Sequence, residues 1–212
     1  MAEAATQQTP TEALIATLDL PQGGWSDAAR KDALSRLQQA GLPERRDEYW
    51  KYTRPDTLTQ PQAVSAAVRA SEDVVLFDQI DRLKLVFVDG VFDADASDDL
   101  ALEGITIERL AQADADLHWA RDLYGTLEKN GQTPVARPLA ALNTAFAADG
   151  VLIHVTDKVS KPVNIVYRRT SETADVMLHH VVKLDAGAEF TLLENGPVAA
   201  RFNGVLEVEV AD

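Results

Sequence analysis

The chain has 212 residues, 46% of them hydrophobic and 25% charged, with a net charge of −14 and a pI of about 4.6. A surface this acidic repels the phosphates of nucleic acids and of anionic lipids, which argues against binding to nucleic acid or to a membrane. The absence of cysteine excludes disulfides, a thiol nucleophile and thiolate metal ligands from this chain. No stretch resembles a secretory signal or a membrane span, so we expect a cytoplasmic protein.

Residues 11–42 predict a helical hairpin. Apolar residues recur at helical spacing in both halves, and the sequence PQGGW interrupts them. Ser26 is a good N-cap for the second helix, with Asp27 in its first turn. Gly41 then ends that helix, and Pro43 follows it. The Ala-rich stretch after this region, residues 62–72, predicts a linker.

The segment RRDEYWKYT, residues 45–53, combines aromatic and charged side chains directly after the hairpin. We expect Trp50 and Tyr52 to pack the hairpin or its linker, because large aromatics fill cores more often than interfaces. Arg46 and Glu48 are expected to form local ion pairs. The alternative is that the aromatic side chains form a docking surface for a partner protein.

Residues 73–150 predict a mixture of strands and helices. LKLVFVDGVF, residues 83–92, is typical of two strands joined by an Asp-Gly turn. Residues 104–110 predict a further strand. Helical spacing of apolar residues predicts one helix over 114–128 and a second over 137–150, the latter closed by Gly150.

From Val151 onward the pattern is short strands alone, each with apolar residues at every second position. Val151, Ile153 and Val155 share one face, for example. In the last strand Leu206, Val208 and Val210 point one way, and Glu207 and Glu209 point the other way. The spacing of the strands allows a sandwich, a jelly roll or a solenoid. The chain ends on this strand, so we expect it to be part of a longer protein.

No catalytic constellation is visible in the sequence, and we assign no catalytic, cofactor-binding or metal-binding residue. His179 and His180 are adjacent on a predicted strand, so their side chains point to opposite faces and cannot easily share one metal ion. His118 and His154 are isolated and are expected to be structural. The aspartates of residues 93–99 lack the glycine and the distal glutamate of a calcium loop.

Two sequence blocks resemble the SufB/SufD family of iron–sulfur cluster assembly proteins. The first is GLPERRDEYWKYT, and the second is LAALNTAFAADGVLIHVTDKVSKPVNIVY. The run HHVVKLDAGAEFTLLE and the missing cysteines fit the SufD branch of that family better than the SufB branch. The residues that carry the two blocks are Arg46, Glu48, Trp50, Lys51, Tyr52 and Thr53, then Leu142, Asn143, Ala145, Phe146, Asp149, Gly150, Lys161 and Pro162.

The resemblance implies a mainly β protein, a right-handed parallel β-helix preceded by an α-helical part. The expected division is a helical domain and linker at 1–72, a mixed lead-in at 73–150 and the first β-helix coils at 151–212. The resemblance further implies the N-terminal half of a non-catalytic scaffold subunit. Its expected partners are a SufB-like paralogue and a SufC-like ATPase, with a homodimer in isolation.

The iron–sulfur cluster would then be assembled transiently by the full complex, and this part of the chain would bind no cofactor. Two rival interpretations are a β-helix carbohydrate-active enzyme and an acidic protein-interaction module.

Overall fold

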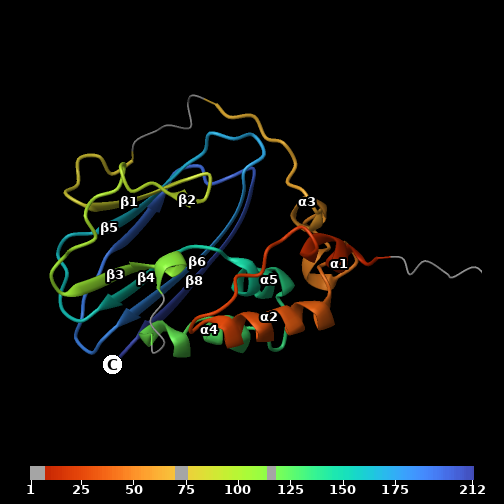
Figure 1. Cartoon of the computed structure of the whole chain (residues 1–212), viewed down its shortest axis with the longest axis horizontal. Helices are drawn as coiled ribbons and strands as arrows, with labels where there is room; N and C mark the ends of the chain where they lie inside the picture. Colours follow the sequence, from red (N-terminus) through yellow and green to blue (C-terminus); the bar gives the residue numbers. More distant parts are fainter. Residues whose placement is uncertain (1–7, 70–75, 114–117) are drawn as a thin grey trace, which may run out of the picture.

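The computed structural model describes residues 8–69, 76–113 and 118–212, which form two facing β-sheets with a layer of helices along one side (Figure 1). One sheet has the strand order β2-β1-β5-β7 and the other the order β3-β4-β6-β8. The strands are β1 Leu83–Val88, β2 Val91–Phe92, β3 Ile105–Arg109, β4 Val151–Val155, β5 Val163–Arg168, β6 Asp175–Leu184, β7 Leu192–Asn195 and β8 Arg201–Val210.

The expected right-handed parallel β-helix is wrong. The described strands form two separate four-stranded sheets, each of mixed direction, and no closed solenoid surrounds the core. β1 pairs antiparallel with β2, and β3 pairs antiparallel with β4, while the other neighbours are parallel. Alternation of apolar residues identifies a strand with one buried face, but it is the same in a solenoid and in two facing sheets.

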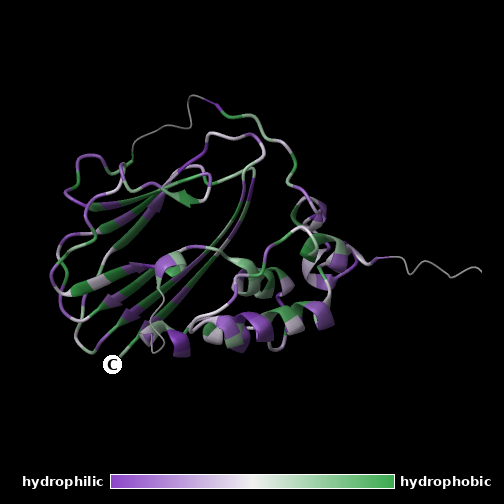
Figure 2. Ribbon diagram, viewed as in Figure 1, coloured by the Kyte–Doolittle hydropathy of each residue, from purple (hydrophilic) through white to green (hydrophobic). Residues whose placement is uncertain are grey.

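The main core lies between the two sheets and consists of side chains at alternate strand positions. Figure 2 shows hydrophobic and hydrophilic residues following one another along strands of both sheets. The predicted set Val151, Ile153 and Val155 is buried there, and Leu152 between them faces the helical side instead. The predicted hairpin at residues 83–92 is confirmed, with the turn at Asp89 and Gly90, both of positive φ. The core members from the other strands include Leu83, Leu85, Phe87, Val163, Ile165, Tyr167, Val176, Leu178 and Val182.

The helical layer confirms the predicted hairpin and packs it on a helix from the middle of the chain. Leu14, Ala33 and Leu37 share a buried cluster with Ala141 and Leu142. Packing against this helix therefore supplies the core that a short helical hairpin lacks on its own. The α-helices are α1 Pro10–Ile15, α2 Asp27–Ala40, α3 Asp56–Thr59, α4 Thr126–Asn130 and α5 Pro138–Phe146.

The continuous helix predicted over 114–128 is wrong within the described residues. A 3₁₀ turn, Trp119–Asp122, precedes α4, and Gly125 between them has a φ of 74°. That left-handed conformation favours glycine and stops a helix from running through. The first four residues of the prediction, 114–117, lie outside the described residues. The helix predicted to close at Gly150 ends at Phe146, because Asp149 and Gly150 already lie against β6.

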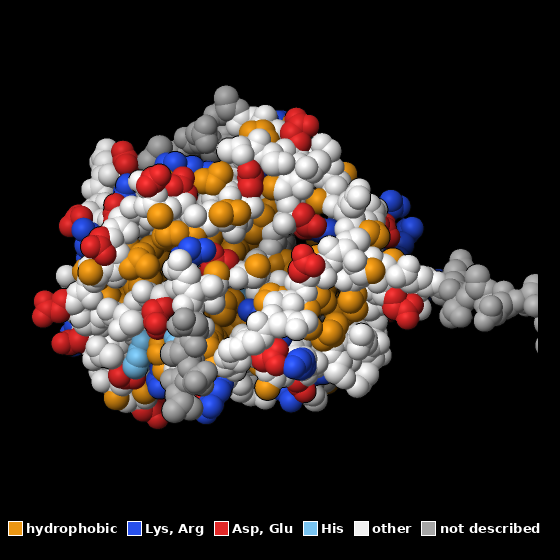
Figure 3. All heavy atoms as spheres, in the orientation of Figure 1, with side chains coloured by type: hydrophobic (Ala, Val, Ile, Leu, Met, Phe, Trp, Pro, Cys, Tyr) orange, Lys and Arg blue, Asp and Glu red, His pale blue; other side chains and the backbone are white. Residues whose placement is uncertain are grey.

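Strand β8 lies at the edge of its sheet and pairs with β6 alone. The predicted alternation is present, but Glu207 is 3% exposed whereas Leu206, Val208 and Val210 are 43%, 43% and 64% exposed. Figure 3 likewise shows hydrophobic side chains gathered in the hollow between the two sheets. An edge strand of this length, with apolar side chains beside it, is a surface that proteins normally cover. No helix in the described part of the chain is long and apolar enough to cross a membrane.

Candidate functional site

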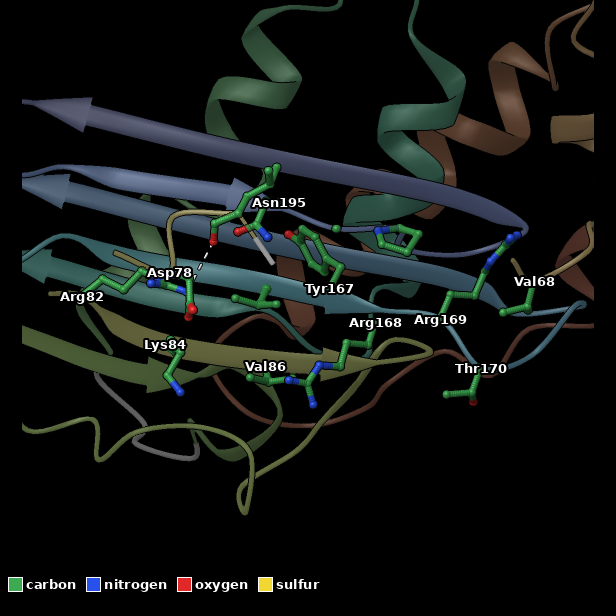
Figure 4. A pocket seen from close by; sticks show the side chains of 14 residues that line it. Val68, Asp78, Arg82, Lys84, Val86, Tyr167, Arg168, Arg169, Thr170 and Asn195 are labelled. Carbon is green, nitrogen blue, oxygen red and sulfur yellow. Dashed lines mark hydrogen bonds and ion pairs between the residues drawn. The ribbon is translucent and has the colours of Figure 1, made fainter. Parts of the chain in front are cut away.

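A basic hollow with a volume of about 770 Å³ lies on the outer face of the sheet β2-β1-β5-β7 (Figure 4). Its floor comes from outward-facing positions of β1 and β5, where Lys84 is in register with Asn164 and Val86 with Val166. Its cationic lining residues are Arg82, Lys84, Arg168 and Arg169, and the carboxylate of Asp78 also lines it. This local excess of positive charge stands out on a chain of net charge −14.

Arg82 and Asn164 fix the inner end of this hollow. Arg82 Nε donates to Asn164 Oδ1 at 2.9 Å, and Asn164 Nδ2 donates to Asn195 Oδ1 at 2.8 Å. The Arg82 guanidinium also donates to the carbonyls of Phe77 and Ile80. Because its donors are occupied by the protein, Arg82 acts as a structural group. Arg168 is exposed and can attract an anion, whereas Lys84 is half-buried and its Nζ lies 3.8 Å from Asp98 Oδ1.

A second polar group lies buried between the helical layer and the sheet β3-β4-β6-β8. His179 Nε2 lies 2.9 Å from Glu207 Oε2, and the His179 ring packs against the Tyr124 ring at 4.2 Å between centroids. Glu207 also accepts from the backbone N–H groups of Gly125 at 2.6 Å and Glu128 at 2.8 Å. The carboxylate thus satisfies the free N–H groups at the start of α4.

The same buried group continues into α2 through two arginines. Arg36 binds Glu128 with both terminal nitrogens, at 2.9 and 2.7 Å. Arg30 is 3% exposed and donates to the carbonyls of Ala145 and Ala147 at 3.1 and 2.8 Å. Burial lowers the pKa of Arg30 and raises the pKa of Tyr124, whose hydroxyl donates to Thr144 O. We call Arg30, Arg36, Tyr124, Glu128, His179 and Glu207 the buried polar cluster.

The two adjacent histidines point to opposite faces of β6, as strand geometry requires. His180 Nδ1 accepts from Val151 N at 3.0 Å, and its Nε2 lies 3.1 Å from the Tyr167 hydroxyl. Tyr167 in turn donates to Glu194 Oε1, so His180 is the neutral tautomer that donates from Nε2. Burial lowers the pKa of His180 to about 3 and also lowers the pKa of His179, against the opposing hydrogen bond to Glu207.

The other candidates from the sequence have structural partners. His118 is buried, stacks on Trp25 at 4.8 Å and contacts Glu108, while His154 contacts Asp185 at 2.9 Å. In the aspartate-rich loop, the carboxylates of Asp93 and Asp98 accept backbone N–H groups. Among the residues that the structure describes, no three metal-ligating side chains come together. Whether this chain binds a metal or a cofactor stays a prediction.

The RRDEYWKYT segment is exposed, which contradicts the packing expected for Tyr52. Tyr52 is 90% exposed and Tyr49 is 71% exposed, while Trp50 is half-buried. Arg46 and Glu48 are also exposed, and neither forms an ion pair with any residue in the described part of the chain. The expected local ion pairs are therefore wrong. Within this segment the backbone forms a 3₁₀ turn at Glu48–Trp50 and not the packed end of a helix.

The sequence analysis recognised the family block that begins LAALNTAFAADG but missed the structural role of its polar residues. Asn143 is fully buried, and its Nδ2 donates to Leu178 O at 3.0 Å and Asn203 O at 2.7 Å. Asp149 accepts from the Arg109 guanidinium and from its neighbour Gly150 N at 2.9 Å. Asn143 thus attaches α5 to β6 and β8, and Asp149 links the segment after α5 to β3, so the motif holds α5 on the sheet. An asparagine within an apolar helix was the signal in the sequence.

Comparison with known proteins identifies the family. The chain belongs to the SufBD proteins, because the model of the SufBD protein N-terminal region matches residues 22–165. It is similar to the iron–sulfur cluster assembly protein SufD of Escherichia coli, with 32% identity over 180 residues. That alignment covers 76% of this chain and 37% of the relative, so the chain spans little more than a third of the relative's length.

Proposed function

We propose that this chain is the N-terminal region of a SufD-like subunit that serves iron–sulfur cluster assembly in the cytoplasm. The observation that carries the proposal is the family match over residues 22–165, together with the similarity to the SufD protein of E. coli. In this proposal the subunit is a non-catalytic scaffold. The cluster is cargo that the whole complex assembles, and it is not a resident cofactor of these residues.

Strand β8 supports a role in assembly. Its outer edge has no strand partner in the described chain, and the apolar side chains of Leu206, Val208 and Val210 are partly exposed beside it. A continuous β edge with neighbouring apolar side chains is suited to pairing with a further strand. Pairing of β8 with such a strand would remove these side chains from water and provide hydrogen-bond partners for the free N–H and C=O groups of its edge.

We propose a SufB-like paralogue and a SufC-like ATPase as the partners in that complex. The scaffold role requires that these subunits associate with it in a fixed ratio. A homodimer is the form that we propose for the isolated protein, with the β8 edge as one candidate contact.

The test is capture of the native gene product from its source cell with an antibody raised against this chain, followed by mass spectrometry. Recovery of a SufB-like protein and a SufC-like ATPase in near-equal amounts is the expected result. A parallel capture with antibody saturated by the purified chain controls for unspecific recovery. Recovery without either subunit would overturn the scaffold proposal and favour a separate acidic interaction module.

A further inference from the structure

Three asparagines of this chain are each followed by glycine, namely Asn130, Asn195 and Asn203. In such a pair the backbone nitrogen of the glycine can attack the side-chain amide of the asparagine, because no glycine side chain shields that nitrogen. The attack converts the asparagine to aspartate or isoaspartate. It needs a backbone N–H group that is free to lose its proton and an amide group that is free to leave. The three pairs differ strongly in these two respects.

The pair at Asn130 is protected by helix hydrogen bonds. Asn130 is the last residue of α4, and its side chain is exposed. Gly131 N, however, donates to Leu127 O at 3.0 Å and to Glu128 O at 3.2 Å. The nitrogen that would attack is therefore occupied, and the end of α4 has to open before this pair can react.

The pair at Asn203 is protected by contacts of its side chain. Asn203 lies within β8, and its Nδ2 donates to Leu139 O of α5 at 2.8 Å. Its carbonyl oxygen accepts from Asn143 Nδ2 at 2.7 Å, which holds the backbone in place. Loss of the side-chain nitrogen as ammonia would break the contact with α5, so the fold opposes reaction at this pair as well.

The pair at Asn195 has neither form of protection. Asn195 ends β7 and lines the basic hollow, and the next residue, Gly196, is exposed (Figure 4). Gly196 N donates no hydrogen bond to any described residue. Glycine is required here, because its φ is 104° and a Cβ would lie 2.0 Å from Tyr167 O. The packing against Tyr167 thus leaves an unshielded backbone nitrogen at the edge of a hollow that water can enter.

The side-chain amide of Asn195 has a fixed orientation. Arg82 Nε donates to Asn164 Oδ1 at 2.9 Å, so Asn164 Nδ2 faces the other way and donates to Asn195 Oδ1 at 2.8 Å. A donor at this oxygen stabilises the negative charge that develops there when the neighbouring Cγ is attacked. Asn195 Nδ2, the group that has to leave, forms no hydrogen bond with any described residue. Both features favour reaction at this amide.

We propose that Asn195 is a site of intramolecular deamidation in the folded protein. Gly196 N loses its proton to water and forms a bond to Asn195 Cγ, and the Nδ2 group takes up a proton and leaves as ammonia. Water then opens the resulting cyclic imide at either of its carbonyl groups, which yields aspartate or isoaspartate. The reaction depends on these contacts alone and not on the function proposed above.

The two products have different effects on the fold. Aspartate keeps an oxygen that accepts from Asn164 Nδ2, so β7 can stay in place. Isoaspartate carries the main chain through its Cβ and lengthens it directly before Gly196, where the close approach to Tyr167 O leaves little room. The modification therefore adds negative charge to the hollow, and its isoaspartate form also disturbs the end of β7.

Peptide mass spectrometry tests the three pairs together, because trypsin places them in separate peptides, residues 130–158, 184–201 and 202–212. The folded protein is incubated at mildly alkaline pH beside a sample unfolded in guanidinium chloride, in which no pair is protected. We expect Asn195 to convert in the folded protein at a rate within severalfold of that in the unfolded sample. Folding should slow conversion of Asn130 and Asn203 at least about tenfold, because hydrogen bonds have to open first. A digest made before incubation corrects for conversion during handling.

Chromatography and a pair of variants assign the reaction. Isoaspartate in the 184–201 peptide, separated from aspartate by chromatography, is diagnostic of the cyclic imide, because direct hydrolysis of the amide gives aspartate alone. Asn195→Gln keeps a carbonyl oxygen for Asn164 but places the amide carbon farther from Gly196 N, so it should abolish conversion in this peptide. The matched variant Asn130→Gln, at an exposed position, should leave conversion of Asn195 unchanged.

Three results would overturn the proposal. In the first, Asn195 stays unconverted in the folded protein while the unfolded sample converts. In the second, Asn130 or Asn203 converts as fast as Asn195 in the folded protein, so that the reaction would be a property of the dipeptide and not of its surroundings. In the third, the 184–201 peptide gains aspartate without isoaspartate, which would mean direct hydrolysis by water.

Discussion

The imidazole of His179 and the carboxylate of Glu207 lie 2.9 Å apart, 0% and 3% exposed, on neighbouring strands. In the strand register Glu207 is opposite Val181, so the two side chains meet diagonally across the sheet. The other ring nitrogen, His179 Nδ1, is also buried, and no described residue forms a hydrogen bond with it. Glu207 is therefore the group that accounts for a polar histidine in this part of the core.

Replacing Glu207 tests how much this contact contributes to stability. Glu207→Ala leaves His179 Nε2 and the N–H groups of Gly125 and Glu128 buried without an acceptor. We expect the free energy of unfolding to fall by about 3–5 kcal/mol, measured by urea denaturation. Glu209→Ala, at an exposed position on the same face of β8, should change it by less than about 0.5 kcal/mol. Equal effects of the two substitutions would contradict the buried role of Glu207.

Stability is expected to fall as the pH drops from about 6.5 toward 5. The unfolded chain takes up a proton at His180 near the ordinary pKa of 6.5, whereas burial holds the folded pKa at about 3. The unfolded state then binds more protons in this window, so folding loses about 2 kcal/mol at pH 5 from this residue. Protonation of Nδ1 in the folded state would also face the Val151 N–H donor.

The control for this pH dependence is a pair of histidine substitutions. His180→Asn keeps an acceptor for Val151 N and removes the titrating group, so the slope of stability against pH should decrease. His154→Asn, at a half-buried ring beside Asp185, should leave most of the slope unchanged. Thermal unfolding followed at a series of pH values measures both, and a slope unaffected by His180→Asn would refute this assignment.

Gly150 is expected to tolerate no side chain. A Cβ built there lies 1.9 Å from His179 O, which is backbone and cannot move aside. Gly150→Ala should therefore reduce stability by about 3 kcal/mol or more, or prevent folding. Gly204→Ala is the matched control, because the atoms nearest to its Cβ belong to the exposed Phe202 ring, which can move, and we expect a loss below about 1 kcal/mol. Soluble yield and urea midpoint compare the two.

Trp50 and Tyr52 should differ in their effect on stability. Trp50 is half-buried, so Trp50→Ala removes apolar contacts and should lower the free energy of unfolding by about 1–2 kcal/mol. Tyr52→Ala should change it by less than about 0.5 kcal/mol, because the side chain is 90% exposed. Thermal melts of the two variants decide the matter. A large loss from Tyr52→Ala would mean that the ring packs against the protein in solution.

Much of the local structure could be predicted from particular residues. Gly41 ends α2 with a positive φ, and the Asp89–Gly90 turn joins β1 to β2, as their backbone preferences indicate. The family resemblance was also visible in short motifs, and the match over residues 22–165 confirms it. The prediction of a closed solenoid was wrong, because no local sequence pattern indicates which strands pair with one another in a sheet.

The candidate sites depended on contacts between distant parts of the chain. The buried polar cluster joins Arg36 of α2 to Glu128 of α4 and then to Glu207 of β8, at separations of 92 and 79 residues. Nothing near Glu207 in the sequence distinguishes it from Glu209. The exposure of Tyr52 was equally hidden, since an aromatic residue after a helical hairpin fits a core position and a surface position alike.

The sequence by itself determined where the strands and the N-terminal helical hairpin lie, which residues share a strand face, and which family the chain belongs to. Those properties follow from backbone preferences and from side-chain alternation, which act within a few residues. Only the tertiary structure decided that Glu207 is covered, whereas Glu209 on the same face of β8 and Val208 on the opposite face are exposed. Burial depends on what packs against a surface, and the helices that cover Glu207 come from distant parts of the chain.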